Sequence, residues 1–241
     1  MLTILFLLTF FSPRTANEYG LPNGAKILET QTIPAKNRTL VLWMLNPKRH
    51  PRDVEDDIYT CPDVTRGHHY TGKLRVTVVD SRTKKSLQTL EIESSEGAEA
   101  TIDIPYKIEA GHYYHVPNGK PKTEAKPKIM WLQDYNGDGK TLEFALFDAI
   151  ACMGLPTSLI GYSAAQDKVI QYKTHLSVGI GKDKKTDEPL WVDYLFAKKP
   201  VKLGLWRYSI DYRGRGGTLD KYEIRFNTKL ERFEGTLIST E

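Results

Sequence analysis

Short apolar segments separated by turn-forming residues occupy most of the second half of this 241-residue chain. Each segment is rich in Val, Ile, Tyr, Trp or Phe and is followed by Gly, Pro or charged residues, which is the pattern of β-strands joined by tight connections. Strands are expected at 169–178, 190–196, 205–212, 222–226 and 233–238. Their regular spacing predicts a C-terminal antiparallel meander.

The first half of the chain has the same character. The run at 39–45 is almost wholly apolar and ends at Asn46-Pro47, as expected of a strand buried on both faces, while 74–78 and 87–93 alternate and predict a β-hairpin. Strands are also expected at 101–106, at a sheet edge or end because of Pro105, and at 111–116. The sequence thus predicts an all-β, mainly antiparallel fold with little helix, in which a β-sandwich-like N-terminal part packs with the C-terminal meander.

The length fits one large β domain or two small ones. Residues 117–128 contain three Pro and four Lys without an apolar period, so they are interpreted as a solvated loop or a domain seam. The predicted regions are therefore 17–120 and 121–241. They form either two units or one continuous domain.

Residues 1–16 have the pattern of a signal peptide. Ten uncharged residues, 2–11, precede Ser12-Pro13 and the small-residue step Thr15-Ala16. We therefore expect a secreted or periplasmic protein, the alternative being a buried N-terminal strand or helix. No other segment approaches the ~18 uninterrupted apolar residues of a membrane span, so no integral membrane segment is expected after cleavage.

Two cysteines, Cys61 and Cys152, allow one intramolecular pairing. In an oxidising compartment a disulfide would close a loop of roughly 90 residues and restrict the unfolded chain. Two unrelated buried thiols are the alternative. The chain has no Cys-x-x-Cys pair, which excludes a zinc ribbon.

The segment Asp-Tyr-Asn-Gly-Asp-Gly-Lys at 134–140 predicts a calcium loop. Calcium takes six to eight hard oxygens, and acidic or amide side chains at alternate positions of a curled loop can supply several of them. Gly139 stands where such a loop turns sharply, but Ala145 occupies the place of the usual bidentate Glu and Glu143 lies two residues earlier. The predicted ligands are Asp134, Asn136, Asp138 and Glu143 through their side chains, and Lys140 through its carbonyl. A polar turn without metal is the alternative.

From this loop onward, residues 131–172 resemble a single FG-GAP or VCBS-type repeat. The resemblance rests on the Asp-x-Asn-Gly-Asp-Gly-Lys loop, the apolar segment Glu-Phe-Ala-Leu-Phe-Asp, Gly161-Tyr162 and the segment Val-Ile-Gln-Tyr. It implies a strand after the loop and calcium held by the loop's Asp and Asn side chains, with Glu143 displaced by one residue from the family's last ligand. A helix over 142–153 is the competing interpretation, because its apolar residues also follow helical spacing.

The charge balance does not indicate nucleic acid. The 34 Lys and Arg are mixed among 30 Asp and Glu, which leaves a net charge of +4. Arg213 and Arg215 flank glycines, and that segment is interpreted as a hairpin turn rather than as an RNA-binding motif.

Two function classes remain open. The first is a non-catalytic exported binding or structural module for a glycan, a cell-envelope component or a protein. Its candidate aromatic contacts are Trp43, Tyr113, Tyr114, Trp191 and Trp206, and the alternative, favoured for most of them, is that they belong to the core. The second is a hydrolase, although Gly-x-Ser-x-Gly, His-Glu-x-x-His and phosphate-loop motifs are absent from the sequence. Its candidate residues are His68, His69, His112 and His115, or carboxylates drawn from Asp56, Asp57, Asp63 and Asp211.

Overall fold

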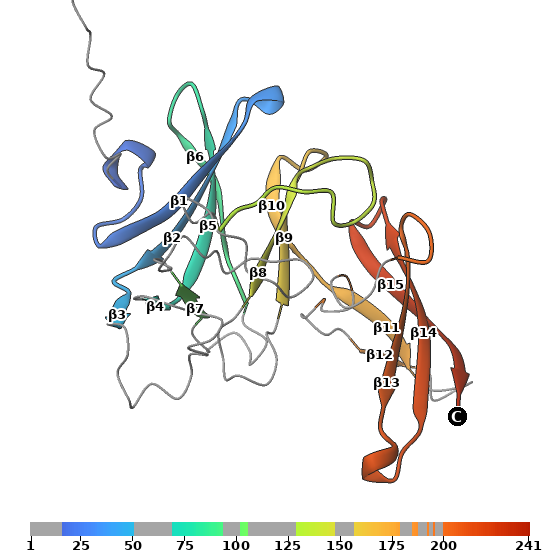
Figure 1. The fold of residues 1–241 in the computed structure, drawn as a ribbon. Helices are drawn as coiled ribbons and strands as arrows, with labels where there is room; N and C mark the ends of the chain where they lie inside the picture. Colours follow the sequence, from blue (N-terminus) through green and yellow to red (C-terminus); the bar gives the residue numbers. More distant parts are fainter. Residues whose placement is uncertain are drawn as a thin grey trace, which may run out of the picture.

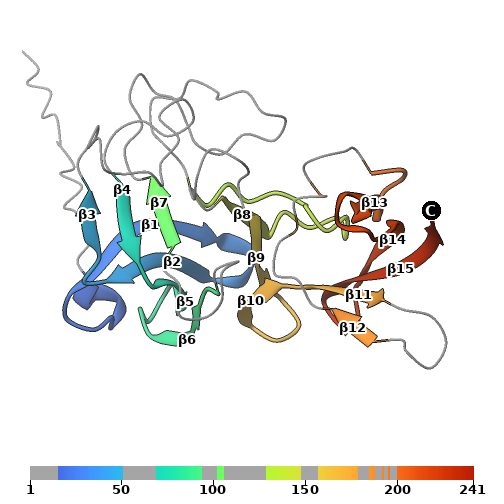
Figure 2. The same cartoon turned by 90° about the horizontal axis from the view of Figure 1, so that it is seen from below.

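The computed structural model describes residues 16–50, 69–93, 102–105, 129–147, 157–178, 185–187, 192, 195 and 200–241. These residues form strands in four sheets with very little helix, so the all-β prediction is confirmed (Figure 1). We call them the N-terminal sheet (order β1-β2-β5-β6), the small sheet (β3-β4-β7), the middle sheet (β10-β9-β8) and the C-terminal sheet (β12-β11-β15-β14-β13). Figure 2 shows the N-terminal, middle and C-terminal sheets in a row.

The N-terminal sheet is wholly antiparallel. Its strands are β1 (Ala25–Ile33), β2 (Arg38–Leu45), β5 (Leu74–Asp80) and β6 (Ser86–Glu91). Strand β2 is buried on both faces, and β5 and β6 form a hairpin, which confirms both predictions. Strand β1 was not predicted, because its polar residues hide the alternation and it is only half-buried.

The outer face of the N-terminal sheet is covered by the segment that enters the fold. This segment begins with η1 (Ala16–Tyr19). Its residues Tyr19 and Leu21 pack on Val41, Trp43 and Val79. Trp43 is 4% exposed, and its Nε1 donates to Thr77 Oγ1 at 2.8 Å. Trp43 is therefore a core residue, which corrects its prediction as a ligand contact.

The two faces of the middle sheet pack into two different hydrophobic cores. It comprises β8 (Glu143–Phe147), β9 (Thr157–Ser163) and β10 (Lys168–Tyr172). Phe144 and Leu146 pack toward the N-terminal sheet, whereas Ala145 between them packs toward the C-terminal sheet. This period of two is that of a strand, so the helix alternative is wrong for 143–147, and residues 148–153 lie outside the described part.

The C-terminal sheet contains the predicted meander. Its strands are β11 (Thr174–Val178), β12 (Lys185–Asp187), β13 (Leu205–Asp211), β14 (Leu219–Asn227) and β15 (Arg232–Thr240). Strands β13, β14 and β15 pair antiparallel in succession, while β11 joins β15 in parallel. The single strand expected at 169–178 is two, because the chain passes at Lys173 from the middle sheet into the C-terminal sheet.

Two segments beside the C-terminal sheet, 190–196 and the turn after β13, test further predictions. A strand was expected at 190–196, of which only Val192 and Leu195 are described. Leu195 is helical, and its N–H donates to the carbonyl of Val192, so the strand prediction is wrong for these two residues, which contact the core. The Gly-rich segment after β13 is the predicted hairpin turn, built on η5 (Arg213–Arg215) with Gly216 at φ 76°.

The small sheet completes the described part. It contains β3 (Lys48–His50), β4 (His69–Gly72) and β7 (Ile102–Pro105), and β7 with Pro105 lies at its edge, as predicted. Residues 1–15, Cys61, Cys152, the segment 111–116 and residues 117–128 lie outside the described residues. No helix in the described part is long and apolar enough to span a membrane.

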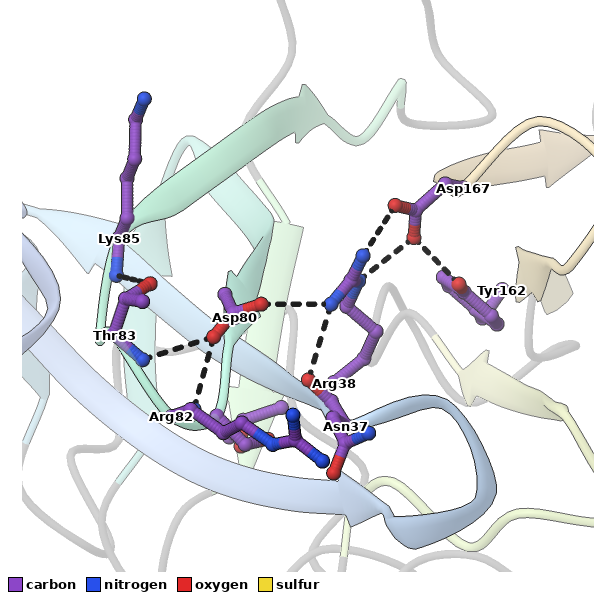
Figure 3. A network of polar contacts seen from close by, with 10 residues as sticks. Asn37, Arg38, Asp80, Arg82, Thr83, Lys85, Tyr162 and Asp167 are labelled. Atoms are coloured by element: carbon purple, nitrogen blue, oxygen red, sulfur yellow. Dashed lines mark hydrogen bonds and ion pairs between the residues drawn. The ribbon is translucent and has the colours of Figure 1, made fainter.

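Arg38 joins the N-terminal and middle sheets (Figure 3). Its guanidinium donates to both carboxylate oxygens of Asp167, at 2.8 and 2.6 Å, and to Asp80 at 3.0 Å. The Tyr162 hydroxyl donates to Asp167 at 2.5 Å. The hydrogen bonds from Arg38 and Tyr162 lower the pKa of Asp167 to about 2. Parallel hydrogen bonds of this kind need the planar fork of an arginine.

Arg38→Lys is expected to lower the free energy of unfolding by about 1 to 2 kcal/mol, because the ammonium keeps the charge and loses the fork. Urea unfolding at neutral pH measures this loss. Because the pKa of Asp167 is lowered on folding, its contribution is present above about pH 4 and lost as the pH falls toward 2. Arg207→Lys, at an exposed pair with Glu223, is the control and should change stability by less than ~0.5 kcal/mol. Equal effects of the two variants would contradict a specific role for the fork.

Candidate functional site

The predicted calcium loop is closed at its neck. The Gln133 N–H donates to the Glu143 carbonyl at 2.8 Å, and the Glu143 N–H donates back to Gln133 at 3.2 Å. Strand β8 begins at Glu143, so the loop is anchored directly on the middle sheet. The nine residues between Gln133 and Glu143 form the loop, and they include all the predicted ligands other than Glu143 itself.

Asp134 organises the loop from its first position. Its Oδ1 accepts from the N–H groups of Gly137, at 2.8 Å, and Asp138, at 3.1 Å, and its Oδ2 accepts from Gly139 at 2.9 Å. The chain can curl around one carboxylate because Gly137 and Gly139 have φ of 77° and 86°, a region that favours glycine. The two glycines of the motif are thus explained by the backbone.

The next two predicted ligands differ in how they point. Asn136 is buried, and its Oδ1 accepts the Asp138 N–H at 2.8 Å. Asp138 instead contacts Lys140: its Oδ1 accepts the Lys140 N–H, and its Oδ2 pairs with the Lys140 Nζ, both at 2.9 Å. The Asp138 carboxylate raises the pKa of Lys140. The loop therefore holds one of its acidic groups against its own lysine.

Glu143 lies beneath the loop and is only 1% exposed. Its Oε2 accepts the Tyr135 N–H at 3.1 Å, and no Lys, Arg or His of the described part forms an ion pair with it. Burial, together with the charges of Asp138 and Asp134, raises its pKa to about 8. Burial, with a further contribution from Glu143, also raises the pKa of Tyr135 and Tyr172. The site thus contains a buried carboxyl group without a countercharge among the described residues.

The strands below the loop leave room for this carboxyl group. At Gly161 in β9, a Cβ atom would lie 2.9 Å from Glu143 Cγ and 2.7 Å from Tyr172 Cε2, so only glycine allows both side chains. Neither Tyr172 nor Gly161 was predicted as part of the site. A glycine inside a strand pattern was the available signal, since it marks a close approach.

The loop also touches the C-terminal sheet. A Cβ atom at Gly137 would lie 3.0 Å from the Gly204 nitrogen, in the turn that precedes β13. The loop therefore lies where the middle and C-terminal sheets meet (Figure 1).

The predicted ligands are gathered in one loop without forming a closed coordination shell. Asp134, Asn136 and Glu143 face the same loop, whereas Asp138 is turned to Lys140. In the part of the chain that the structure describes, no three His, Cys, Asp or Glu side chains are grouped as metal ligands. The side chains of Asp134, Asn136 and Asp138 instead accept hydrogen bonds from backbone N–H groups and from Lys140.

The other predicted candidates do not come together in the described part. His69 lies in β4, while His68, His112, His115, Asp56, Asp57, Asp63, Tyr113, Tyr114 and Trp191 are outside the described residues. Asp211 ends β13 and pairs with Arg213, which lowers its pKa to about 2. Trp206 is buried, with its ring 5.7 Å from that of Phe233, so its prediction as a ligand contact is corrected in the same way as that of Trp43.

The chain was also compared with known proteins. No protein-family model, curated protein or solved structure matches it.

Proposed function

We propose that this protein is a non-catalytic, exported β module in which the loop 134–143 binds Ca²⁺ and stabilises the junction of the middle and C-terminal sheets. The observation that carries the proposal is Glu143, a buried carboxyl group with two further carboxylates nearby and no cationic partner among the described residues. A buried charge is costly unless it is paired, neutralised or bound to a metal.

The donor set fits a hard cation. Every candidate ligand supplies oxygen, from the side chains of Asp134, Asn136, Asp138 and Glu143 and from the Lys140 carbonyl, which suits Ca²⁺ and not a soft metal. A bound Ca²⁺ would supply positive charge near Glu143, whose pKa the charges of Asp138 and Asp134 help to raise. Asp134 and Asn136 position the loop backbone, and Asp138 must exchange its contact with the Lys140 ammonium to take part.

The burial of Glu143 favours a structural role over a hydrolytic one. An acid that is 1% exposed and lies between packed strands offers no access to a substrate. The contact of Gly137 with Gly204 instead places the loop where an ion would strengthen the attachment of the C-terminal sheet. The partner of such a module, proposed as a glycan, a cell-envelope component or a protein, would bind elsewhere on the β surface.

Calcium is expected to raise the melting temperature relative to chelator. A ligand present at 100 times its Kd and bound only by the folded state adds about 2.7 kcal/mol, which for a chain of this size shifts the midpoint by roughly 5 to 10 °C. Scanning fluorimetry with Ca²⁺, with Mg²⁺ and with EGTA measures the shift. Identical midpoints in Ca²⁺ and EGTA would contradict the proposal.

Asp138→Asn provides the ligand test, because it keeps the backbone acceptor at Oδ1 and removes the charge. The calcium shift should shrink or disappear. Asp220→Asn is the matched control, since Asp220 lies in β14 and accepts a hydrogen bond from the exposed Thr218 hydroxyl. Its calcium shift should equal that of the unmodified protein.

A further inference from the structure

Two hairpin turns lie side by side at one end of the N-terminal sheet (Figure 1). They are the β1–β2 turn, which contains η2 (Pro34–Lys36), and the β5–β6 turn at 81–85. The Ser81 N–H donates to the Asn37 carbonyl at 2.9 Å, and the Ser81 hydroxyl bonds the Thr39 hydroxyl at 2.8 Å. Charged residues from both turns are therefore brought together, although they are some 45 residues apart in the sequence.

The charges at this end are predominantly positive. Five cationic residues, Lys36, Arg38, Arg82, Lys84 and Lys85, stand with three carboxylates, Glu18, Asp80 and Asp167. Two of the carboxylates are engaged inside the network of Figure 3: Asp167 binds Arg38 and Tyr162, and Asp80 binds Arg38 and the N–H groups of Arg82 and Thr83. Arg38 therefore pairs with two of the three carboxylates at this end.

Four cationic side chains remain for solvent: Lys36, Arg82, Lys84 and Lys85, which we call the basic turn pair. In the described part of the chain, Lys36, Arg82 and Lys85 form no ion pair within 4.0 Å, and Lys84 reaches Glu18 only at 4.0 Å. Figure 3 shows the Lys85 side chain pointing away from the Arg38 network. Lys36 helps to lower the pKa of Asp167 through its charge, but none of these four cations forms an ion pair with Asp80 or Asp167.

Lys84 also has a backbone that favours glycine. Its φ is 61°, and its N–H donates to the Asp80 carbonyl at 2.9 Å to close the turn. A side chain in the left-handed region is strained, and glycine relieves that strain. The turn geometry therefore does not require a lysine at this position, and among the described residues its ammonium reaches only Glu18, at 4.0 Å.

We propose that the basic turn pair is a docking surface for an anionic lipid bilayer. Four clustered cations are enough to be attracted by the negative potential of such a surface. The residues of the two turns, 34–37 and 81–85, include no aromatic side chain on which a sugar or a base could stack. Three of the four are lysines, which act as point charges and suit a diffuse negative surface better than a specific bidentate site.

Vesicle sedimentation of the full chain tests the proposal. Binding is expected to phosphatidylcholine vesicles with about 30% phosphatidylglycerol at about 0.1 M salt, and little at about 0.5 M. Pure phosphatidylcholine vesicles should bind little. This control distinguishes docking through charge from insertion of the apolar residues 2–11. Equal binding to both vesicles, or none to the anionic ones, would overturn the proposal. So would capture by an anionic polysaccharide without vesicle binding.

The variant K36Q/R82Q/K84Q/K85Q should bind anionic vesicles at least about a hundredfold more weakly, because each of the four cations contributes roughly fivefold. The matched control K48Q/K202Q/R215Q/K229Q removes the same number and types of charge from exposed positions elsewhere. It should retain binding within about twofold. Equal losses in the two variants would show an effect of net charge and overturn a role for this surface.

Lys84→Gly separates docking from folding. Vesicle binding should weaken by roughly fivefold, while the melting temperature is maintained or raised, because glycine accepts the left-handed backbone. A lower melting temperature with unchanged binding would assign Lys84 a purely structural role and overturn its part in the proposal.

Discussion

Glu143→Gln is expected to stabilise the calcium-free protein by about 5 kcal/mol above pH 8. The pKa of Glu143 is raised from 4.5 to about 8 by burial and by its acidic neighbours, and each pKa unit corresponds to 1.36 kcal/mol. Glutamine keeps the oxygen that accepts the Tyr135 N–H and removes the charge. Most single substitutions in a protein core are destabilising, so a gain of this size would be diagnostic.

The effect has a defined dependence on pH. Because the folded state holds the Glu143 proton more tightly than the unfolded state, the free energy of unfolding in EGTA should fall as pH rises from about 4.5 to 8. It should then level off above pH 8. In Glu143→Gln this contribution is absent, and urea unfolding across the range, with the variant as reference, measures it.

Calcium provides the second half of this test. The unmodified protein should recover stability when Ca²⁺ replaces EGTA at pH 8, whereas Glu143→Gln should gain little. Glu93→Gln is the control, because Glu93 is half-exposed and pairs with Lys173, and it should change stability by less than ~0.5 kcal/mol. A Glu143→Gln variant that is less stable in EGTA and keeps its calcium response would refute both the burial cost and the ligand role.

Phe233→Ala should cost about 3 to 5 kcal/mol of stability. Phe233 in β15 is fully buried between the middle and C-terminal sheets, with ring centroids 5.1 Å from Phe226, 5.7 Å from Trp206 and 6.4 Å from Tyr172. Removing it loses apolar burial and leaves a cavity among aromatic rings that cannot all close in. Urea unfolding followed by circular dichroism measures the loss.

Ile238→Ala is the matched control on the same strand, because Ile238 is 51% exposed. It should cost less than about 1 kcal/mol. If Phe233→Ala also cost less than 1 kcal/mol, the aromatic core would not be what holds the C-terminal sheet to the middle sheet.

Local patterns in the sequence were sufficient for most of the strands. The continuous apolar run in β2, the alternation in β5 and the glycines before β14 each depend on neighbouring residues, so they could be predicted without the rest of the chain. The alternation of β8 also separated strand from helix once its burial was known. Strand β1 escaped prediction because its polar composition hides a half-buried face.

The candidate site divides in the same way. The spacing of Asp134, Asn136 and Asp138 and the two glycines predicted a tightly curled loop, which is what the structure shows. The sequence could not reveal that Asp138 contacts Lys140 or that Glu143 is buried beside Tyr172 and Gly161. The Asp138–Lys140 contact depends on the exact curl of the loop, and the burial of Glu143 depends on strands β9 and β10 from further along the chain.

An all-β chain with a curled acidic loop could be predicted from local patterns, because strand alternation and turn chemistry act over a few residues. The arrangement of the strands depends on contacts across the whole fold: which strands share a sheet, the parallel pairing of β11 with β15, and the packing of the middle sheet into two cores. It also brought Arg38 to Asp167 and left the four cations of the basic turn pair facing solvent. These features arise from contacts between residues far apart in the sequence, and the charge state of Glu143 follows from the burial that such contacts create.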